Sequence, residues 1–171
     1  MILRIPADAM VVLIGPSGSG KTTFAARHFA PTEVLSSDAL RAMVADDASD
    51  QTATEAAFEL LHTALAMRLA RRRLTVVDAT SVEGWARERL LAVARRLGRP
   101  TAAIVFNLPL ATCLERNALR TDRRLPPPAI RRQHARMLDS LDRLAGEGFE
   151  PVVVLASAEE VERLSLERIG S

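Results

Sequence analysis

The 171-residue sequence predicts an α/β fold in three layers, in which a five-stranded parallel sheet is covered by helices on both faces. Short segments that are almost wholly apolar alternate with longer amphipathic segments along the chain. Strands that are apolar on both faces are typical of parallel sheets, because helices cover both sides. A glycine-rich loop also follows the first apolar segment directly and opens a helical one. Because neither a linker nor a repeat interrupts this alternation, we expect one domain, residues 1–171.

Five strands are expected where short apolar runs are bounded by polar or turn-forming residues. The carboxyl ends of parallel strands meet at one edge of a sheet, and open α/β sheets bind their ligands at that edge. The site should therefore lie in the segments that follow these strands. The expected strands are residues 10–14, 33–36, 74–78, 101–106 and 151–155.

Helices are expected between and after these strands. Ser36, Ser37 and Asp38 are each able to cap the second helix. A stripe of leucine and alanine side chains marks one face of the third, and Gly98 ends the fourth. The expected helices are residues 20–28, 38–45, 52–72, 82–97, 110–121, 129–145 and 158–169.

Composition argues against several classes of protein. The chain has 23 Lys and Arg against 21 Asp and Glu, so a uniformly basic nucleic-acid coat is excluded. Tyrosine is absent and there is one tryptophan, so we do not expect a long single-strand track built on stacking. The apolar runs are too short to span a membrane, no leader peptide is recognised, and Cys113 is the lone cysteine. These features predict a cytoplasmic protein without a membrane partner.

The glycine-rich loop fills every fixed position of the phosphate-binding motif G-x-x-x-x-G-K-[ST] at residues 15–22. Among the 23 Lys and Arg residues, Lys21 is the only lysine. Its slim ammonium is able to enter beside the β- and γ-phosphates, where a planar guanidinium does not fit. We therefore predict a P-loop kinase-like fold with ATP as the phosphate donor. The expected nucleotide-binding residues are Gly15, Ser17, Gly18, Ser19, Gly20, Lys21, Thr22 and Thr23.

A carboxylate at the end of the third expected strand predicts a metal site. Residues 74–78 are apolar and end in Asp78, which is the Walker B form. Asp78, directly or through a water, and the Thr22 hydroxyl are the expected ligands of Mg²⁺ or Mn²⁺. The alternative is that Asp78 caps the segment that follows it.

The sequence sets aside two classes of P-loop protein and favours a phosphotransferase with a second substrate. It contains neither the Asn-Lys-x-Asp box of guanine-specific switch proteins nor the Leu-Ser-Gly-Gly-Gln segment of transport ATPases. A phosphotransferase needs a group that deprotonates the attacking hydroxyl. Asp38 is the candidate base, and Arg41, one helical turn later, is the candidate ligand for an anionic group of the acceptor. Spacing alone equally allows Asp38 to be a helix cap and Arg41 its surface partner.

Three arginines, Arg116, Arg120 and Arg123, recur at helical spacing and are predicted to form one cationic stripe. Like charges arranged in this way repel unless an anion satisfies them. We interpret residues 115–130 as a helical arginine lid, closed off by prolines 126–128, that stabilises charge on the transferring phosphoryl group. The alternative is a solvated basic face. Residues 71–73 are also all arginine, at a helix end where the helix dipole favours cations.

The whole chain resembles the 5′-hydroxyl polynucleotide kinase module of bacterial polynucleotide kinase-phosphatases, which are RNA-repair enzymes. A P-loop alone is generic, whereas several segments in this order are specific. The segments that carry the resemblance are GPSGSGKTTFAARHFAPTEVLSSDALR, DDASDQTATEAAF, LTVVDATSV, VFNLPLATCLERNALRTDR and EGFEPVVVL.

The resemblance implies roles for residues on the acceptor side. Asp38 would be the general base for the 5′-OH, and Arg41 would engage the phosphate of the terminal nucleotide. Gln51 and Thr80 fall in similar segments near the acceptor. The chain departs from the family pattern at Ser81, where asparagine is usual, and at Thr22, where serine is usual. The resemblance also implies that the three stripe arginines act on the donor phosphates from a lid, as Arg116, Arg120 and Arg123.

Our hypothesis from the sequence is a kinase that moves the γ-phosphate of ATP, or of another nucleoside triphosphate, to the 5′-OH end of RNA or DNA in nucleic-acid repair. The family has further catalytic domains, so the chain is expected to be an excised kinase domain or a truncated relative. The analogy also allows a homodimer. A P-loop kinase of a small metabolite is the first alternative, and a nucleotide-sensing module without transfer is the second.

Overall fold

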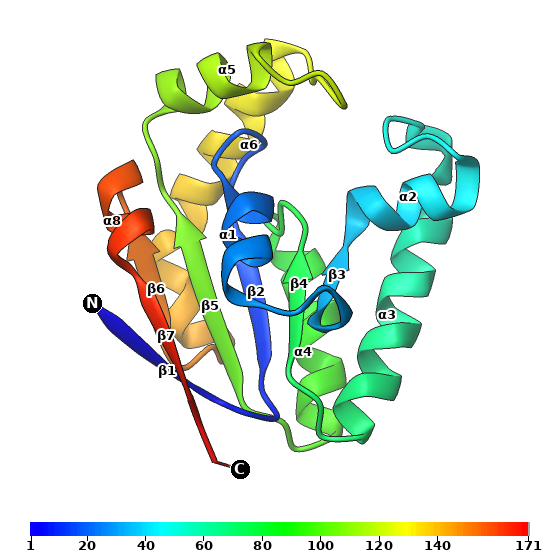
Figure 1. The fold of residues 1–171 in the computed structure, drawn as a ribbon, viewed down its shortest axis with the longest axis vertical. Coiled ribbons are helices and arrows are strands. Elements are labelled where there is room, and N and C mark those ends of the chain that lie inside the picture. Colours follow the sequence, from blue (N-terminus) through cyan, green and yellow to red (C-terminus); the bar gives the residue numbers. More distant parts are fainter. Residues whose placement is uncertain (171) are drawn as a thin grey trace.

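The computed structural model describes residues 1–170 and contains a central five-stranded parallel sheet (Figure 1). The strand order is β3-β4-β2-β5-β6, and every neighbouring pair is parallel. The predicted α/β fold with five parallel strands is therefore confirmed. The strands are β2 (Met10–Ile14), β3 (Val34–Ser36), β4 (Thr75–Asp78), β5 (Thr101–Phe106) and β6 (Val152–Leu155).

The central strand β2 places the phosphate-binding loop in the middle of the sheet edge. All of its residues are buried, and it pairs with β4 on one side and β5 on the other. Val12 faces Val77 of β4 and Ala103 of β5 in this register. An apolar strand in this position is stabilised by both helical layers. The loop that follows Ile14 thus starts from a strand that is buried on both faces and paired on both edges.

Helices cover both faces of the sheet (Figure 1). Phe24 of α1 packs with Phe106 on one face, together with residues of α8 and its flanks. On the other face, Leu65 of α3 and Leu91 of α4 pack against the sheet. The helices are α1 (Lys21–His28), α2 (Ser37–Ala45), α3 (Thr54–Ala70), α4 (Gly84–Arg96), α5 (Leu110–Ala118), α6 (Pro127–Ser140), α7 (Leu144–Glu147) and α8 (Ala158–Arg163), with 3-10 turns at Pro31–Glu33, Gln51–Ala53 and Leu141–Arg143.

The end of the chain differs from the sequence prediction. The helix expected over residues 158–169 is wrong beyond α8, because residues 165–169 form the strand β7 (Ser165–Ile169). This strand pairs in parallel with β1 (Ile2–Pro6), a strand that we did not predict, in a separate two-stranded sheet. Leu3 and Leu166 face each other in its register and pack on the core. The partner of β7 lies at the opposite end of the sequence, so no local pattern reveals it.

Two expected helix ends are also corrected. The helix expected over residues 110–121 ends at Ala118, and the one expected over 129–145 breaks after Ser140 into a 3-10 turn followed by α7. The prolines at 126–128 do not simply close a lid: Pro127 is the first residue of α6, where its missing N–H costs nothing. The arginine segment therefore lies between two helices.

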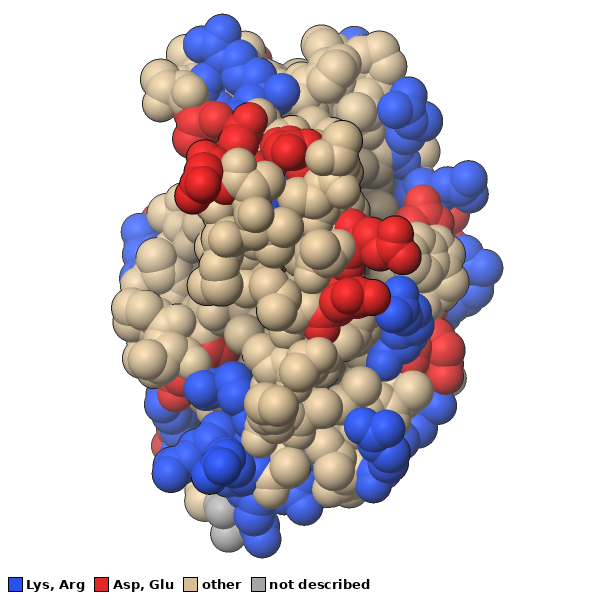
Figure 2. All heavy atoms as spheres, turned by 90° about the vertical axis from the view of Figure 1, so that its right-hand side faces the viewer, with Lys and Arg blue, Asp and Glu red and all other residues tan. Residues whose placement is uncertain are grey.

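The surface formed by α2 and α3 is largely uncharged in its middle (Figure 2). Met43 of α2 and Met67 of α3 are 72% and 63% exposed. The inward residues of α3, such as Leu61 and Leu65, are fully buried in the core. Helix α3 thus has apolar side chains on two faces. No helix among residues 1–170 is both long enough and apolar enough to cross a membrane.

Candidate active site

The phosphate-binding loop follows β2 and depends on two glycines with left-handed backbone. Gly18 has φ 82° and Gly20, which caps α1, has φ 97°. A Cβ on Gly18 would lie 2.3 Å from the carbonyl oxygen of Cys113 in α5. The loop therefore approaches the backbone of α5 more closely than any side chain at position 18 allows. The Gly15 N–H donates to Thr80 O at 3.0 Å and fixes the loop against the end of β4.

Lys21 is buried at the inner side of this loop. Its ammonium donates to the carbonyl oxygens of Gly15 and Pro16 at 2.8 and 2.9 Å. Burial lowers the pKa of Lys21 to about 8, and the Asp78 carboxylate offsets part of this shift. The ammonium is therefore held away from water, where a phosphate would be a strong partner.

Thr22 and Asp78 meet at the end of β4, as the metal-site prediction requires. The Thr22 hydroxyl donates to Asp78 Oδ2 at 2.8 Å. Burial raises the pKa of Asp78, against the opposing effects of Lys21 and of the Thr22 hydrogen bond. The N-cap of the following helix α4 is Glu83, so Asp78 does not cap that helix.

This donor set fits Mg²⁺, which binds one or two protein oxygens and takes its other ligands from water and nucleotide phosphates. Thr22 and Asp78 supply a hydroxyl and a carboxylate at adjacent positions. Among the described residues there is no cluster of three or more His, Cys, Asp and Glu that would form a cage made of protein alone. A divalent ion held here would therefore depend on the nucleotide.

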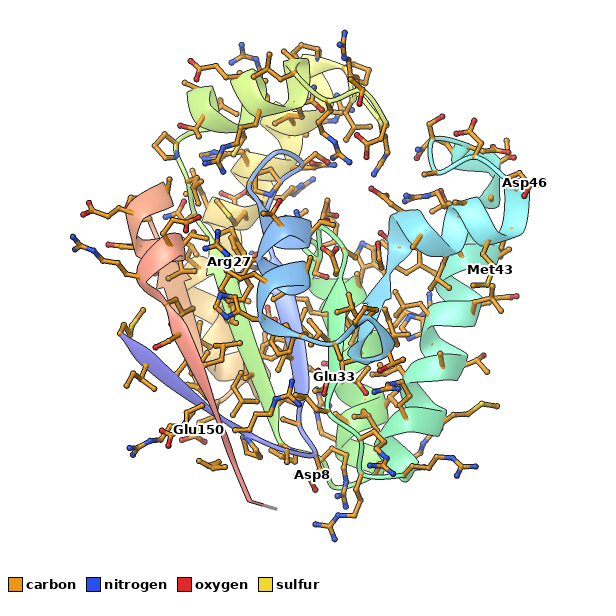
Figure 3. All side chains as sticks on the ribbon, viewed as in Figure 1. Asp8, Arg27, Glu33, Met43, Asp46 and Glu150 are labelled. Atoms are coloured by element: carbon orange, nitrogen blue, oxygen red, sulfur yellow. The ribbon has the colours of Figure 1, made fainter. Side chains whose placement is uncertain are left out.

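A cavity of about 440 Å³ opens above the loop. One side is formed by the N-terminus of α8 and by Arg27 of α1, which extends toward α8 and pairs with Glu162 (Figure 3). The structure brings most of the predicted site residues into the lining of this one cavity. Those residues are Ser17, Gly18, Gly20, Lys21, Thr22, Thr23, Asp38, Asp78, Thr80, Arg116, Arg120 and Arg123.

Another side of the cavity is formed by the start of α2, which carries the candidate base Asp38. Ser36 caps this helix through a 3.3 Å hydrogen bond from Ala39 N, so Asp38 is not its N-cap. The Asp38 carboxylate faces the cavity, and its Oδ1 accepts a hydrogen bond from Arg41 Nη1 at 2.5 Å. Arg41 is buried, and its Nε donates to Thr54 Oγ1 at 3.1 Å. A buried guanidinium therefore fixes the position of the candidate base.

The three stripe arginines line the same cavity, but not through one helix. The predicted helical stripe is wrong, because α5 ends at Ala118 and both Arg120 and Arg123 follow it. The turn that carries them is held by Asn117, which donates to Leu125 O and accepts from Leu125 N at 2.9 and 3.0 Å. A buried amide thus replaces the helical hydrogen bonds that the sequence pattern suggests.

The arginines of this turn differ in their partners. Arg123 donates to Asp38 Oδ1, and its buried Nε has no hydrogen-bond partner among the described residues. Arg120 makes two hydrogen bonds to Asp122 and lies 4.0 Å from Asp38 Oδ2. Arg116, on α5, is exposed, and its Nη1 would lie 3.3 Å from a Cβ on Gly20. The cationic side of the cavity is thus built from one helix and one turn.

Two further residues predicted to lie near the acceptor line a second cavity. Thr80 lines both cavities, whereas Gln51 is exposed and lines only the second one. Ser81, where the resemblance leads us to expect asparagine, has a left-handed φ of 50°. Asparagine adopts this conformation more readily than serine.

The loop over residues 79–83 is fixed by residues that sequence reasoning missed. Arg87 is fully buried and donates from Nη1 to the carbonyl oxygens of Ser81 and Val82 at 3.0 and 2.8 Å. Its other nitrogens pair with Glu147 at 2.6 and 2.7 Å. Nothing in the local sequence separates Arg87 from the surface arginines of α4. Only its contacts with a residue 60 positions later reveal it.

Comparison with known proteins places this geometry in a family. A sequence profile described as an AAA domain matches residues 10–144, which include the loop, Asp38, Asp78 and the arginine turn. The chain belongs to this family. None of the curated proteins matches the chain.

Solved structures show that this AAA-domain chain has a P-loop kinase-like fold. A chain of the Pnkp1/Rnl/Hen1 RNA repair complex matches with a TM-score of 0.67 and 19% identity over 83% of this chain and 47% of that one. A gluconokinase from Sinorhizobium meliloti 1021 matches with a TM-score of 0.56 and 21% identity, over 92% of this chain and 87% of the gluconokinase chain. The APS kinase CysC of Mycobacterium tuberculosis, in complex with AMPPNP and APS, matches with a TM-score of 0.52 and 23% identity. This match covers 67% of this chain and 71% of the CysC chain. The chain thus spans about half of the repair-complex chain and most of the gluconokinase.

Proposed function

We propose that this chain transfers the γ-phosphoryl group of ATP, or of another nucleoside triphosphate, to the 5′-OH end of RNA or DNA. The observation that carries the proposal is that Asp38 faces the same cavity as Lys21 and Asp78, with the buried Arg41 at its side. A carboxylate opposite a phosphate-binding loop is where the base of a phosphotransferase belongs. Similarity to a chain of an RNA repair complex supports a nucleic-acid acceptor.

The donor would lie on the loop, with its phosphates against the backbone N–H groups and the Lys21 ammonium. Thr22 and Asp78 would hold Mg²⁺ or Mn²⁺, which neutralises charge on the β- and γ-phosphates when bound. Arg116, Arg120 and Arg123 would offset the charge that develops on the phosphoryl group in the transition state. These groups together supply positioning and electrostatic stabilisation, which account for most of the catalysis in phosphoryl transfer.

Asp38 would accept the proton of the acceptor hydroxyl while that oxygen attacks the γ-phosphorus in line, and ADP leaves. Arg41 and Arg123 both donate to Oδ1. Oδ2, in contrast, makes one ion pair among the described residues, with Arg120 Nη2 at 4.0 Å. Oδ2 is therefore the oxygen that we assign to the hydroxyl proton, while the arginines hold the carboxylate in place. Arg41 would also bind the phosphate that follows the terminal nucleoside.

A small-metabolite kinase is the second candidate. The match to a gluconokinase, which covers 92% of this chain and 87% of that one, supports this candidate. In that case Arg41 would bind a carboxylate or another small anion of the acceptor. The ion pair between Asp38 and the buried Arg41 argues against a nucleotide sensor without transfer, because such a protein has no need of a base.

The test is phosphate transfer from γ-labelled ATP with Mg²⁺ to three sets of acceptors. These are 5′-OH RNA and DNA oligonucleotides, the same oligonucleotides with a 5′-phosphate, and gluconate, APS and other small metabolites. We expect label on the 5′-OH oligonucleotides alone, and none with the Lys21→Ala variant as the control for a contaminating kinase. Label on a metabolite but on no oligonucleotide would refute the proposal.

A further inference from the structure

A second cavity, of about 640 Å³, lies between α3, α4 and the end of β4. It meets the catalytic cavity at Ala79 and Thr80, which line both. The two cavities therefore adjoin at the end of β4. Most residues that line this cavity have no role in the proposed phosphoryl transfer.

A short chain of contacts connects the second cavity to the candidate base. Thr54 lines this cavity and accepts a 3.1 Å hydrogen bond from Arg41 Nε. Arg41 in turn donates to Asp38 at 2.5 Å. An acceptor with its hydroxyl at Asp38 and an anionic group at Arg41 would thus extend toward this cavity.

Two large aromatic side chains line the second cavity, and its charged side chains are mostly negative. Trp85, the only tryptophan of the sequence, lines it with 67% of its surface exposed, together with the half-buried Phe58. An exposed indole beside a cavity offers a flat stacking surface. The carboxylates that line the cavity belong to Glu55, Glu59 and Glu83, and the one guanidinium to Arg89. Carboxylates repel phosphate but accept hydrogen bonds from the amino groups of nucleobases.

A neutral imidazole adds to this polar edge. Burial, and then the neighbouring Arg89, lower the pKa of His62, which lines the same cavity. A neutral imidazole has one donor and one acceptor nitrogen, which matches the mixed edge of a base. Gln51 supplies a further donor and acceptor at the rim. The lining therefore suits a flat, uncharged, hydrogen-bonding group and not a second phosphate.

We propose that this cavity binds a nucleobase at the 5′ end of the acceptor strand, stacked on Trp85, while Arg41 holds the adjoining phosphate. The inference rests on the proposed function and deepens it, because it identifies the acceptor as a nucleotide chain through its base. A sugar acid lacks an aromatic plane and would leave Trp85 uncovered. Trp85 is thus a specificity-determining residue for acceptor binding, and it has no part in the proton transfer at Asp38.

The emission of this single tryptophan gives a direct binding test with the full chain. A 5′-OH oligonucleotide is titrated into the protein without ATP, next to the same oligonucleotide with abasic sites at its first two positions. We expect saturable quenching by the intact strand. The dissociation constant of the abasic strand should be at least about fivefold higher, because base–aromatic stacking is lost. Equal quenching curves for the two strands would overturn the proposal.

Steady-state kinetics provide the second arm. Trp85→Ala should raise the KM for the oligonucleotide about tenfold, with kcat and the KM for ATP changed less than about twofold. Trp85→Phe should restore most of the affinity, since it keeps a stacking surface. Met67→Ala, at an exposed position of α3 that does not line the cavity, is the matched control and should leave every constant unchanged.

The two proposals fail in different ways. If the Trp85→Ala enzyme phosphorylates oligonucleotides with an unchanged KM, the cavity does not bind the acceptor base, and the proposed function stands. If the unmodified chain phosphorylates no oligonucleotide, the proposed function fails. An unfolded Trp85→Ala variant would be recognised by its circular dichroism, in which case the abasic comparison on the unmodified protein decides.

Discussion

The two sides of the cavity above the phosphate-binding loop, which we propose bind the phosphate donor and the acceptor, are built differently. The donor side consists of the loop after β2 and the end of β4, where Lys21 and Asp78 are 8% and 4% exposed. On the acceptor side, the Asp38 side chain is 29% exposed, and its partners Arg41 and Arg123 come from α2 and from the turn after α5. The donor side follows from one local motif and two buried strands, whereas the acceptor side needs two elements that lie far apart in the sequence. In the proposed function, nucleotide binding would thus depend on the sequence motif, and the choice of acceptor would depend on the tertiary structure.

The largest effect should come from breaking the donor side. Lys21→Ala removes the ammonium that would lie beside the β- and γ-phosphates, and we expect kcat/KM to fall by about 10³-fold for every acceptor. Lys21→Arg keeps the charge, but the wider guanidinium should not fit the buried site, so it should rescue little activity. Transfer assays with both variants measure this, and near-normal activity of Lys21→Ala would contradict the assignment of the donor side.

The next largest effect concerns the loop that joins the two cavities. Arg87→Ala should lower the free energy of unfolding by about 3 kcal/mol, because it leaves the Glu147 carboxylate without its partner and the carbonyl oxygen of Ser81 without its donor. Arg95→Ala is the matched control on the same helix, since its pair with Glu88 is exposed and should contribute less than about 1 kcal/mol. Urea denaturation of the three proteins gives the comparison. A loss as small as that of the control would show that Arg87 does not hold the loop.

Breaking the acceptor side at the arginine turn should have a smaller effect. Arg123→Ala removes a cation that contacts Asp38, and we expect kcat/KM to fall by about 10²-fold with little change in nucleotide affinity. Arg124→Ala changes the neighbouring arginine, which is exposed and does not line the cavity, and should cost less than about threefold. If both variants lose the same activity, the turn acts through its net charge and not through the contact at Asp38.

The smallest effect is a dependence of nucleotide affinity on pH. A bound triphosphate should raise the pKa of Lys21 above its value of about 8 in the free protein. Affinity for metal-free ATP should therefore change little between about pH 7 and 8, where the terminal phosphate is already ionised, and fall above about pH 8 by at most about tenfold per pH unit. Lys21→Met, which has no group that titrates there, should bind weakly with a flat profile between pH 8 and 9. Isothermal titration calorimetry measures both, and the same slope in both proteins would exclude Lys21 as its origin.

The difference between local motifs and contacts of distant elements also explains which features could be predicted from the sequence. The five parallel strands and the loop were predictable because each is encoded by adjacent residues, and the structure confirms the fold. The sheet of β1 and β7 was not predictable, because its two strands come from opposite ends of the chain. The helical stripe of arginines was wrong because Asn117 stabilises a turn in place of a further helical segment.

The candidate site shows the same limit. Lys21, Thr22 and Asp78 could be chosen from motifs, and the structure brings them together. For Asp38 the spacing left a cap and a base equally open, and only the cap at Ser36 separates the two. The pair of Arg87 and Glu147 and the cavity at Trp85 depend on packing between distant elements. No spacing rule would have found them.

The central claim, that Asp38 is the base of a phosphoryl transfer to a 5′-OH end, is tested most directly with the Asp38→Ala variant. Transfer from ATP to a 5′-OH oligonucleotide and equilibrium binding of ATP are measured on the same protein preparation. We predict that transfer is abolished while ATP affinity stays within about threefold of the unmodified chain, because the donor side does not use Asp38. Full transfer activity in this variant would contradict the account.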